Sequence, residues 1–388
     1  MNPRTRTLSR SRRTMTPALD PLESRQLLST VVLPMHGPML EHHHHGMWMH
    51  HAAAVGRVHS PQHARPDPPA AAMVSAASTT FNVVAQFSNA SFADTAAIAD
   101  SDIWAVGTTN LDTSSDTPLA VHFDGMSWSA VPTPTLKGRN DFDGVAAVAS
   151  NDVWAVGAQD ISSTGFAQPL IEHWDGTSWS VVSSPKLKQD GALEAVTAIS
   201  TNNVWAVGLL DDLSAALVEH WDGTSWSVVS SPAFTGIQEV TAISADASND
   251  IWAVTSSPIV LHFDGTNWSQ VHAGSEPRYG FFSLRGITAL SPTNVWAVGE
   301  GKFCNGCGPV GLTYNWDGTS FNRVANPAKG LSSVSAISAS NIWAVGSEIE
   351  NWEGTSWTTV TAPTGGGGVS TLGDGTVVFV AGNAIVEN

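Results

Sequence analysis

Apolar and polar positions follow a long repeat from residue 79 to the end of the chain. In a legible copy, Ala195–Gly208, an apolar segment is followed by a Thr-Asn-Asn turn and by Val-Trp-Ala-Val-Gly. A variable stretch then leads to Leu-Val-Glu-His-Trp and, through Asp-Gly, to Trp-Ser-Val-Val. Short β-branched and aromatic runs between turn residues indicate strands, and Asp-Gly indicates a tight hairpin. Each copy therefore predicts four antiparallel strands.

Six full copies occur, each marked by two aromatic positions. The first position is occupied by Trp104, Trp154, Trp205, Trp252, Trp296 and Trp343, and the second by Trp128, Trp179, Trp226, Trp268, Phe321 and Trp357. In the second strand, Val204 and Ala206 point one way while Trp205 and Val207 point the other, so neither face can be left in water. A sheet stacked between two others satisfies this condition. Repeats of about 40 to 50 residues with four strands each are typical of a β-propeller.

The last copy supplies only three strands and ends at Asn388. In our alignment Phe379 replaces the first Trp of this copy. Phe81-Asn82-Val83-Val84 aligns with Trp-Ser-Val-Val, so we expect this N-terminal strand to complete the last blade and leave the ring without an open edge. The sequence thus predicts an all-β fold over residues 79–388, a seven-bladed β-propeller with four antiparallel strands per blade.

The first 78 residues have a different composition. They hold eight Lys and Arg against four Asp and Glu, a charge of +4, whereas residues 79–388 hold nine against thirty, a charge of −21. We interpret residues 1–34 as a targeting leader and residues 35–78 as a disordered linker rich in His, Met, Ala and Pro. The net charge of −17 argues against nucleic-acid binding. No apolar run is long enough for a transmembrane segment.

Within the leader, Pro21-Leu22-Glu23-Ser24-Arg25 continues into Gln-Leu-Leu-Ser. This segment resembles the LEPR-XLL motif that opens many large exported proteins of one bacterial phylum, with Ser24 where an acidic residue is common. The resemblance implies a secreted or cell-surface protein. A basic disordered tail without a targeting role is the alternative.

A histidine tract lies in the linker. Imidazole groups bind Cu and Ni ions, and the candidate ligands are His42, His43, His44, His45, His50 and His51. A flexible tract offers neither fixed geometry nor outer hydrogen bonds to orient its ligands. Specific metal storage and a solvated linker both stay open. We predict no resident cofactor and only adventitious Cu or Ni at this tract.

The repeat ends its second strand with Val-Gly and continues into His-Trp-Asp-Gly-Thr-Ser-Trp. It resembles a divergent kelch repeat of the galactose-oxidase-like propellers, with one Gly where kelch repeats have two. The resemblance covers nearly all of residues 79–388 and implies a secreted bacterial β-propeller. The copper site of galactose oxidase cannot be assembled here, because Tyr279 and Tyr314 are the only tyrosines and both cysteines share one loop.

Residues that recur in most copies are explained by blade geometry. The Trp residues are expected to pack blade against blade, and the Asp-Gly pairs to form hairpin turns. One position of the third strand is shared by His122, His173, His220 and His262, with Asn315, Asn351 and Asn388 in the other copies. A His that Asn replaces indicates a hydrogen bond inside the sheet rather than a general base.

Length variation is confined to the connections from the second to the third strand and from the fourth strand to the next blade. In a four-stranded blade both emerge on one face, around the mouth of the central channel, where we expect a binding surface. Two charged loops supply the candidate ligand-binding residues, which are Arg278, Tyr279, Phe281, Arg285, Lys137 and Arg139. The alternatives are that Phe281 and Phe282 simply begin the innermost strand of the fifth blade and that the Lys137 loop is only solvated charge.

Cys304 and Cys307 are the only cysteines and lie in another variable loop. Outside the cell, such a pair indicates a small disulfide. A zinc site would need four ligands, and a redox pair would need a helix after the first cysteine, where Gly308-Pro309 stands.

No catalytic set is assembled, so we predict an exported, monomeric and non-catalytic propeller that binds an extracellular protein or glycan through its variable-loop face. The alternative is an extracellular carbohydrate-active enzyme, a hydrolase or lyase, with its site at the channel mouth. Fold alone does not decide between them.

Overall fold

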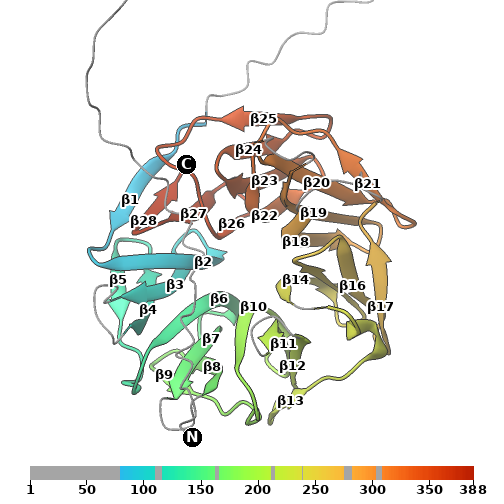
Figure 1. Ribbon diagram of the computed structural model, residues 1–388. Coiled ribbons are helices and arrows are strands. Elements are labelled where there is room, and N and C mark those ends of the chain that lie inside the picture. The colour runs from blue at the N-terminus through green and yellow to red at the C-terminus, as the bar shows by residue number, and fades with distance from the viewer. Residues whose placement is uncertain are drawn as a thin grey trace, which may run out of the picture. The chain divides into compact units, whose positions relative to one another are not determined.

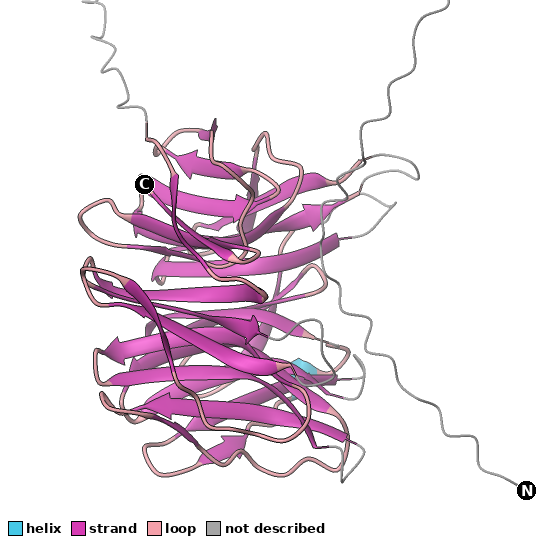
Figure 2. Cartoon of the chain, turned by 90° about the vertical axis from the view of Figure 1, so that its left-hand side faces the viewer, coloured by secondary structure: helices cyan, strands magenta, loops and turns pink. Residues whose placement is uncertain are grey.

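The computed structural model describes residues 79–109, 116–161, 166–210, 215–237, 239–274, 282–302 and 308–388. In this part the strands form seven antiparallel sheets of four strands each. Figure 1 shows the sheets arranged as blades around a central axis, and Figure 2 shows the same strands from the side. The predicted all-β, seven-bladed propeller is confirmed. The one helix among the described residues is a short 3-10 turn, η1 (Pro232–Phe234).

The strands of each blade follow the chain from the axis outward. Blade 1 contains β2 (Ala90–Ala99), β3 (Asp102–Thr109), β4 (Thr117–Phe123) and β5 (Trp128–Val131). Blade 2 contains β6 (Asn140–Ala149), β7 (Asp152–Ile161), β8 (Phe166–Trp174) and β9 (Trp179–Val181). Blade 3 contains β10 (Gly191–Ser200), β11 (Asn203–Leu210), β12 (Ala215–Trp221) and β13 (Trp226–Val228).

The remaining blades continue in the same order. Blade 4 contains β14 (Val240–Ala247), β15 (Asp250–Thr255), β16 (Ile259–Phe263) and β17 (Trp268–His272). Blade 5 contains β18 (Phe282–Ser291), β19 (Asn294–Gly301), β20 (Val310–Trp316) and β21 (Phe321–Val324). Blade 6 contains β22 (Leu331–Ser338), β23 (Asn341–Gly346), β24 (Ile349–Trp352) and β25 (Trp357–Val360).

Blade 7 joins two distant parts of the chain. It contains β26 (Val369–Thr371), β27 (Val377–Ala381) and β28 (Ala384–Glu387), with β1 (Asn82–Gln86) as its outermost strand. β1 pairs antiparallel with β28, with Val83 opposite Val386, and the two strands lie side by side in Figure 1. Phe81 packs edge-on against Trp343 of blade 6 at 5.5 Å between ring centroids. The predicted closure by the N-terminal strand is confirmed.

The alignment of the last copy was wrong by one residue. In the other blades, the first Trp pairs with the third-strand His or Asn and packs against the next blade. In blade 7 this place is taken by Val378, which pairs with Glu387 and lies in the cluster shared with blade 1. Phe379 instead belongs to the cluster shared with blade 6. Val378 therefore replaces the Trp, and Glu387, not Asn388, stands at the His position. Alternate residues of a strand face opposite ways, so a shift of one residue exchanges the two faces.

The core consists of seven apolar clusters, one between each pair of neighbouring blades. Between blades 1 and 2, for example, Trp104 and Val106 pack against Val153 and Ala155, all buried. The second strand of every blade contributes to both of its faces. This explains why Val-Trp-Ala-Val is apolar throughout, and it confirms the prediction that both faces are covered.

Four glycines precede the short inner strand of blade 7. A Cβ at Gly366 would lie 2.7 Å from the Phe379 ring, and a Cβ at Gly368 would overlap the backbone and carboxylate of Asp94 in blade 1. The Gly367 and Gly368 amides donate to the Val380 and Ala93 carbonyls. The run is thus packed against blades 7 and 1, where only glycine fits.

Candidate partner-binding face

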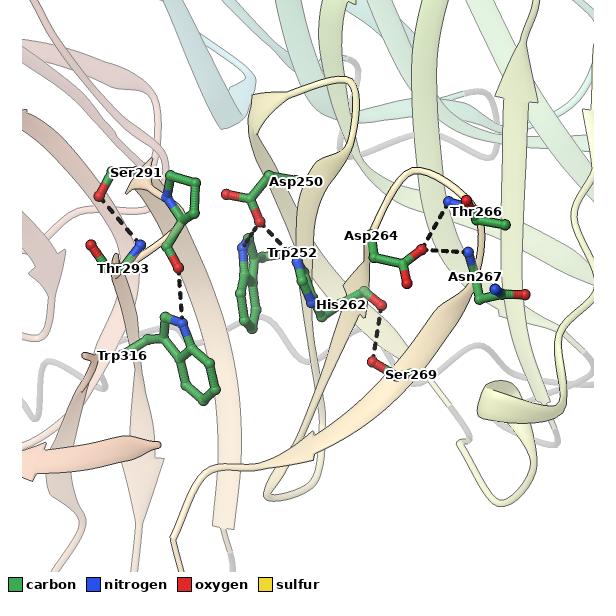
Figure 3. A network of polar contacts seen from close by, with 11 residues as sticks. Asp250, Trp252, His262, Asp264, Thr266, Asn267, Ser269, Ser291, Thr293 and Trp316 are labelled. Carbon is green, nitrogen blue, oxygen red and sulfur yellow. Dashed lines mark hydrogen bonds and ion pairs between the residues drawn. The ribbon is translucent and has the colours of Figure 1, made fainter. Parts of the chain in front are cut away.

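Each of blades 1 to 6 contains the same polar lock. An Asp or Asn stands two residues before the first Trp and accepts a hydrogen bond from the third-strand His or Asn; these acceptors are Asp102, Asp152, Asn203, Asp250, Asn294 and Asn341. In blade 4, Asp250 Oδ1 accepts from His262 Nε2 at 2.8 Å and from the Trp252 indole at 2.7 Å, as Figure 3 shows. The His ring also stacks on this Trp, with centroids 3.9 Å apart.

The lock confirms that these histidines make hydrogen bonds inside the sheet. A carboxylate only accepts, so the shared proton lies on Nε2. The indole also bonds to this acceptor in blades 2, 3, 4 and 5. Sequence reasoning missed the acceptor, although Asp or Asn before Val-Trp or Ile-Trp recurs in six copies.

The Asp-Gly hairpins are also part of the scaffold. Asp175 Oδ1 accepts from the backbone amides of Thr177 and Ser178 and from the Thr177 hydroxyl. These hydrogen bonds, first among them that of the Thr177 side chain, lower the pKa of Asp175 to about 2. Gly176 has φ 91°, as the turn requires. Oδ1 of this carboxylate is therefore occupied by its own turn.

The two faces of the ring differ in charge. We call the side reached by the short connections, from first to second and from third to fourth strand, the turn face. Its connections hold no Lys or Arg. They hold exposed carboxylates all round the ring, at Asp100, Asp124, Asp175, Asp222, Asp264, Asp317, Glu353 and Asp374.

We call the opposite side, which carries the long connections, the loop face. Of the nine Lys and Arg in residues 79–388, all except Arg323 lie in these connections or near the start of a strand that follows one. They are Lys137, Arg139, Lys186, Lys188, Arg278, Arg285, Lys302 and Lys329. Nearly all Lys and Arg residues of the propeller thus belong to the face whose loops vary in length.

A ring of β-bulges lies just inside the loop face. In blades 1 to 6 the register between the first two strands shifts within the first four residues of the innermost strand, so the ladder skips one residue. These bulge residues are Ala93, Asp143, Glu194, Thr241, Arg285 and Ser332, all partly exposed. Bulges re-aim side chains and are enriched near functional sites. The innermost strands contact one another around the axis, so the bulge residues form one circle.

The structure places three of the predicted ligand-binding residues. Arg285 is the bulge residue of blade 5, and its Nη2 donates to Glu300 Oε1 at 2.8 Å. Arg139 donates from Nε and Nη2 to Asp116 Oδ2 at 3.0 and 2.7 Å, which ties the loop before β6 to the one before β4. Lys137 is exposed in the loop before β6. Arg285 and this loop therefore belong to different blades of one face.

The other candidates lie outside the described residues. These are Arg278, Tyr279 and Phe281, the pair Cys304 and Cys307, and the histidine tract with His42, His43, His44, His45, His50 and His51. Their proposed roles stay predictions. No helix in the part of the chain that the structure describes is long and apolar enough to cross a membrane.

Several carboxyl groups that sequence reasoning missed are buried or half-buried. Burial raises the pKa of Asp94, on β2 beside the bulge, to about 6, although the Val145 amide donates to it at 3.2 Å. Burial also raises the pKa of Glu172 to about 8, and those of Glu219 and Glu350 to about 7. These three Glu residues share one position in the third strand. In the sequence, an acidic residue within an otherwise apolar strand could have indicated these buried carboxyl groups.

No family model and no curated protein matches the chain. Solved structures with a similar fold include YCF48 from Cyanidioschyzon merolae, 16% identical with a TM-score of 0.56, over 80% of this chain and 98% of that chain. A structure described as YCF48 bound to D1 peptide is 15% identical with a TM-score of 0.55, over 79% and 93%. The WD40 β-propeller domain of Doa1 is 13% identical with a TM-score of 0.56, over 80% and 97%. Identities this low show the fold alone: residues 79–388 form a seven-bladed β-propeller similar to WD40 domains. The relationship of the repeat to kelch repeats stays a prediction.

Proposed function

We propose that this propeller is a non-catalytic binding protein that takes a segment of a partner protein on its loop face. The observation that carries the proposal is that variable connections and nearly all Lys and Arg side chains lie on the same face. Loops held by a rigid scaffold are the usual carriers of recognition. The turn face has short, nearly constant connections, and its Asp side chains are occupied by their own turns.

The chemistry of the loop face fits a polypeptide partner. Exposed lysines lie in its connections, while Asp143, Glu194 and Arg285 lie on the innermost strands. A peptide offers charges of both signs together with backbone groups, and this mixed arrangement can pair with both. YCF48, whose fold is similar, is described as bound to a peptide, which supports a peptide over a glycan as the first partner to test.

We also propose that the protein is exported or held at the cell surface. The support is the resemblance of residues 21–29 to the LEPR-XLL segment. Fractionation of cells that express the whole chain, with and without Arg25→Ala and Leu27→Ala, tests it. We expect the native chain outside the cytoplasm and the variant inside; equal cytoplasmic location of both contradicts export by this segment.

Charge reversal on each face tests partner binding. The whole chain is used to select peptides from a random phage-displayed library. Affinities of the selected peptides are then compared for a loop-face variant, Lys188→Glu with Lys329→Glu, and a matched turn-face variant, Met126→Lys with Glu353→Lys. All four residues are exposed. We expect at least a tenfold loss for the loop-face variant and less than a twofold change for the turn-face variant.

Two results would contradict the proposal. One is that the native chain selects no peptide, and the other is that only the turn-face variant loses affinity. A parallel panel of polysaccharide substrates tests the enzyme alternative. Turnover that Arg278→Ala or Tyr279→Phe abolishes would favour a carbohydrate-active enzyme instead.

A further inference from the structure

Arg285 is the only cationic residue in the circle of bulges. It lies between Leu284 and Gly286, which pair with Gly299 and Val298 of β19, while Arg285 itself has no ladder partner. The bulge frees its side chain from the regular alternation of the strand. Its side chain is 27% exposed at the loop-face end of blade 5.

The guanidinium is held but not saturated. Its Nη2 donates to Glu300 Oε1 at 2.8 Å, and the Glu300 side chain is only 12% exposed. Arg285 Nε is buried and has no hydrogen-bond partner in the described part of the chain. Leaving a buried donor of a charged group unpaired is energetically unfavourable. The residues that the structure describes supply no acceptor to this atom.

A carboxylate is the acceptor that fits this geometry. A guanidinium offers five N–H donors in a planar fork, and Glu300 uses one of them. The side chain is partly exposed, so its exposed N–H donors can pair with a second carboxylate. Because Glu300 fixes the plane of the fork, little side-chain freedom remains to be lost on binding.

Neighbouring charges favour an anion at this end of the face. Exposed Lys302 directly follows β19, and exposed Lys329 lies two residues before β22. Lys329 also has Glu348 as a partner at 3.7 Å. The acidic bulge residues, Asp143 and Glu194, lie in blades 2 and 3. Lys302 and Lys329 thus attract an anion that approaches blades 5 and 6.

We propose that Arg285, oriented by Glu300, anchors a carboxylate of the bound peptide, either an acidic side chain or a free C terminus. The inference rests on the proposed function, since it names the chemistry that the loop face recognises. It predicts that the partner segment carries a negative charge where it passes blade 5.

The Nε–H signal of Arg285 provides a test that needs no peptide. The whole chain is labelled with 15N-arginine, and the signal is assigned by its loss in Arg285→Lys. We expect acetate to shift this signal saturably and acetamide to leave it unchanged. Arg139 is an internal control, because its Nε already donates to Asp116 Oδ2 at 3.0 Å. Equal shifts of both arginines, or no shift of Arg285, would overturn the inference.

Peptides selected by the native chain provide the second test and separate the two sources of carboxylate. Each is compared with a form whose Glu and Asp are replaced by Gln and Asn, and with a form amidated at the C terminus. We expect one replacement to weaken binding about tenfold to the native chain and to have no further effect on Arg285→Ala. Arg323→Ala, on the outermost strand β21 of the same blade and away from the loop face, serves as the control variant.

The outcomes separate this inference from the proposed function. Selected peptides that bind Arg285→Ala as tightly as the native chain contradict the carboxylate anchor and leave loop-face binding intact. Failure to select any peptide contradicts the proposed function, while the acetate titration still decides whether Arg285 binds a carboxylate. Unchanged thermal unfolding of Arg285→Ala shows that lost binding is not lost folding.

Discussion

A single oxygen atom two residues before each first Trp organises the outer half of a blade. This oxygen accepts the hydrogen bond of the third-strand His or Asn, and it belongs to Asp in blades 1, 2 and 4 and to Asn in blades 3, 5 and 6. The position therefore requires an acceptor rather than a charge. The His that donates to it can accordingly be neutral, which fits its replacement by Asn in blades 5 and 6.

Removing this acceptor should destabilise the propeller far more than neutralising it. Asp152→Ala leaves the Trp154 indole and His173 Nε2 without their partner at 3.0 and 2.8 Å. We expect the free energy of unfolding, measured with urea, to fall by about 2 to 4 kcal/mol. Asp152→Asn keeps the acceptor and should cost less than about 1 kcal/mol. Equal losses in the two variants would show that charge, not acceptance, matters.

The buried carboxyl groups make stability depend on pH. Glu172 is fully buried, and the pKa of about 8 exceeds its ordinary value of 4.5. Between these two values the folded state holds more protons than the unfolded state, so stability falls as pH rises. Glu172→Gln removes the contribution of this one group to the pH dependence of stability. We expect its stability relative to the native chain to rise by about 3 kcal/mol between pH 5 and pH 8.

Urea unfolding at pH 5, 7 and 8 measures this difference, and the exposed Glu353→Gln serves as the matched control. Glu219 and Glu350 titrate in every variant and cancel in the comparison. A constant difference between Glu172→Gln and the native chain over this range would show that Glu172 is ionised inside the fold.

At the scale of strands, blade 7 fits the ring because its inner strand is short and preceded by glycine. Gly366→Ala places a methyl group against the Phe379 ring, whereas nothing lies within 4 Å of a Cβ at Gly373, in the next turn. We expect Gly366→Ala to lower the free energy of unfolding by about 1 to 3 kcal/mol. Gly373→Ala should be nearly neutral. Comparable unfolding curves for both variants would contradict the close packing.

Strand number, order and ring closure were predictable because each copy repeats the same apolar and turn signals. The register of the last copy was not, because Val377-Val378-Phe379-Val380 lacks the Trp that marks it, and aromatic type misled the alignment. Only the clusters on either side decide which residue faces which blade. The bulges were equally hidden, since one extra residue breaks the alternation without a composition signal.

The candidate site was predictable only in part, for a related reason. Arg285 and Arg139 stand out by charge in variable loops, so their place on the loop face followed from topology. Their partners lie elsewhere in the chain, Glu300 near the end of β19 and Asp116 in the connection before β4. Pairing between connections depends on how neighbouring strands end in space, and a single sequence does not report it.

At the scale of the whole propeller, closure depends on one strand pair. Deleting residues 79–86 exposes the outer edge of β28 and uncovers the Phe81 site. We expect a lower thermal midpoint and a less cooperative unfolding transition, which differential scanning calorimetry measures. An unchanged midpoint would mean that β1 contributes nothing to the ring.

A crosslink tests the same pair without removing residues. In a Cys304→Ser, Cys307→Ser background, Val83→Cys with Val386→Cys joins cross-strand partners, so a disulfide should form on oxidation and raise the midpoint. Val83→Cys with Val360→Cys, which joins outer strands of different blades, should remain reduced. Oxidation of both pairs alike would contradict the register.

The pairing of β1 with β28 also orders the events of biosynthesis. β1 leaves the ribosome before any other strand of the propeller, and its partner leaves last, nearly three hundred residues later. The six continuous blades can assemble as they emerge, but β1 cannot pair with β28 until β28 has been synthesised. A nascent chain that has not reached Ala384 lacks β28, so β1 and β27 each have an unpaired strand edge. The ring therefore stays open until β28 has been synthesised.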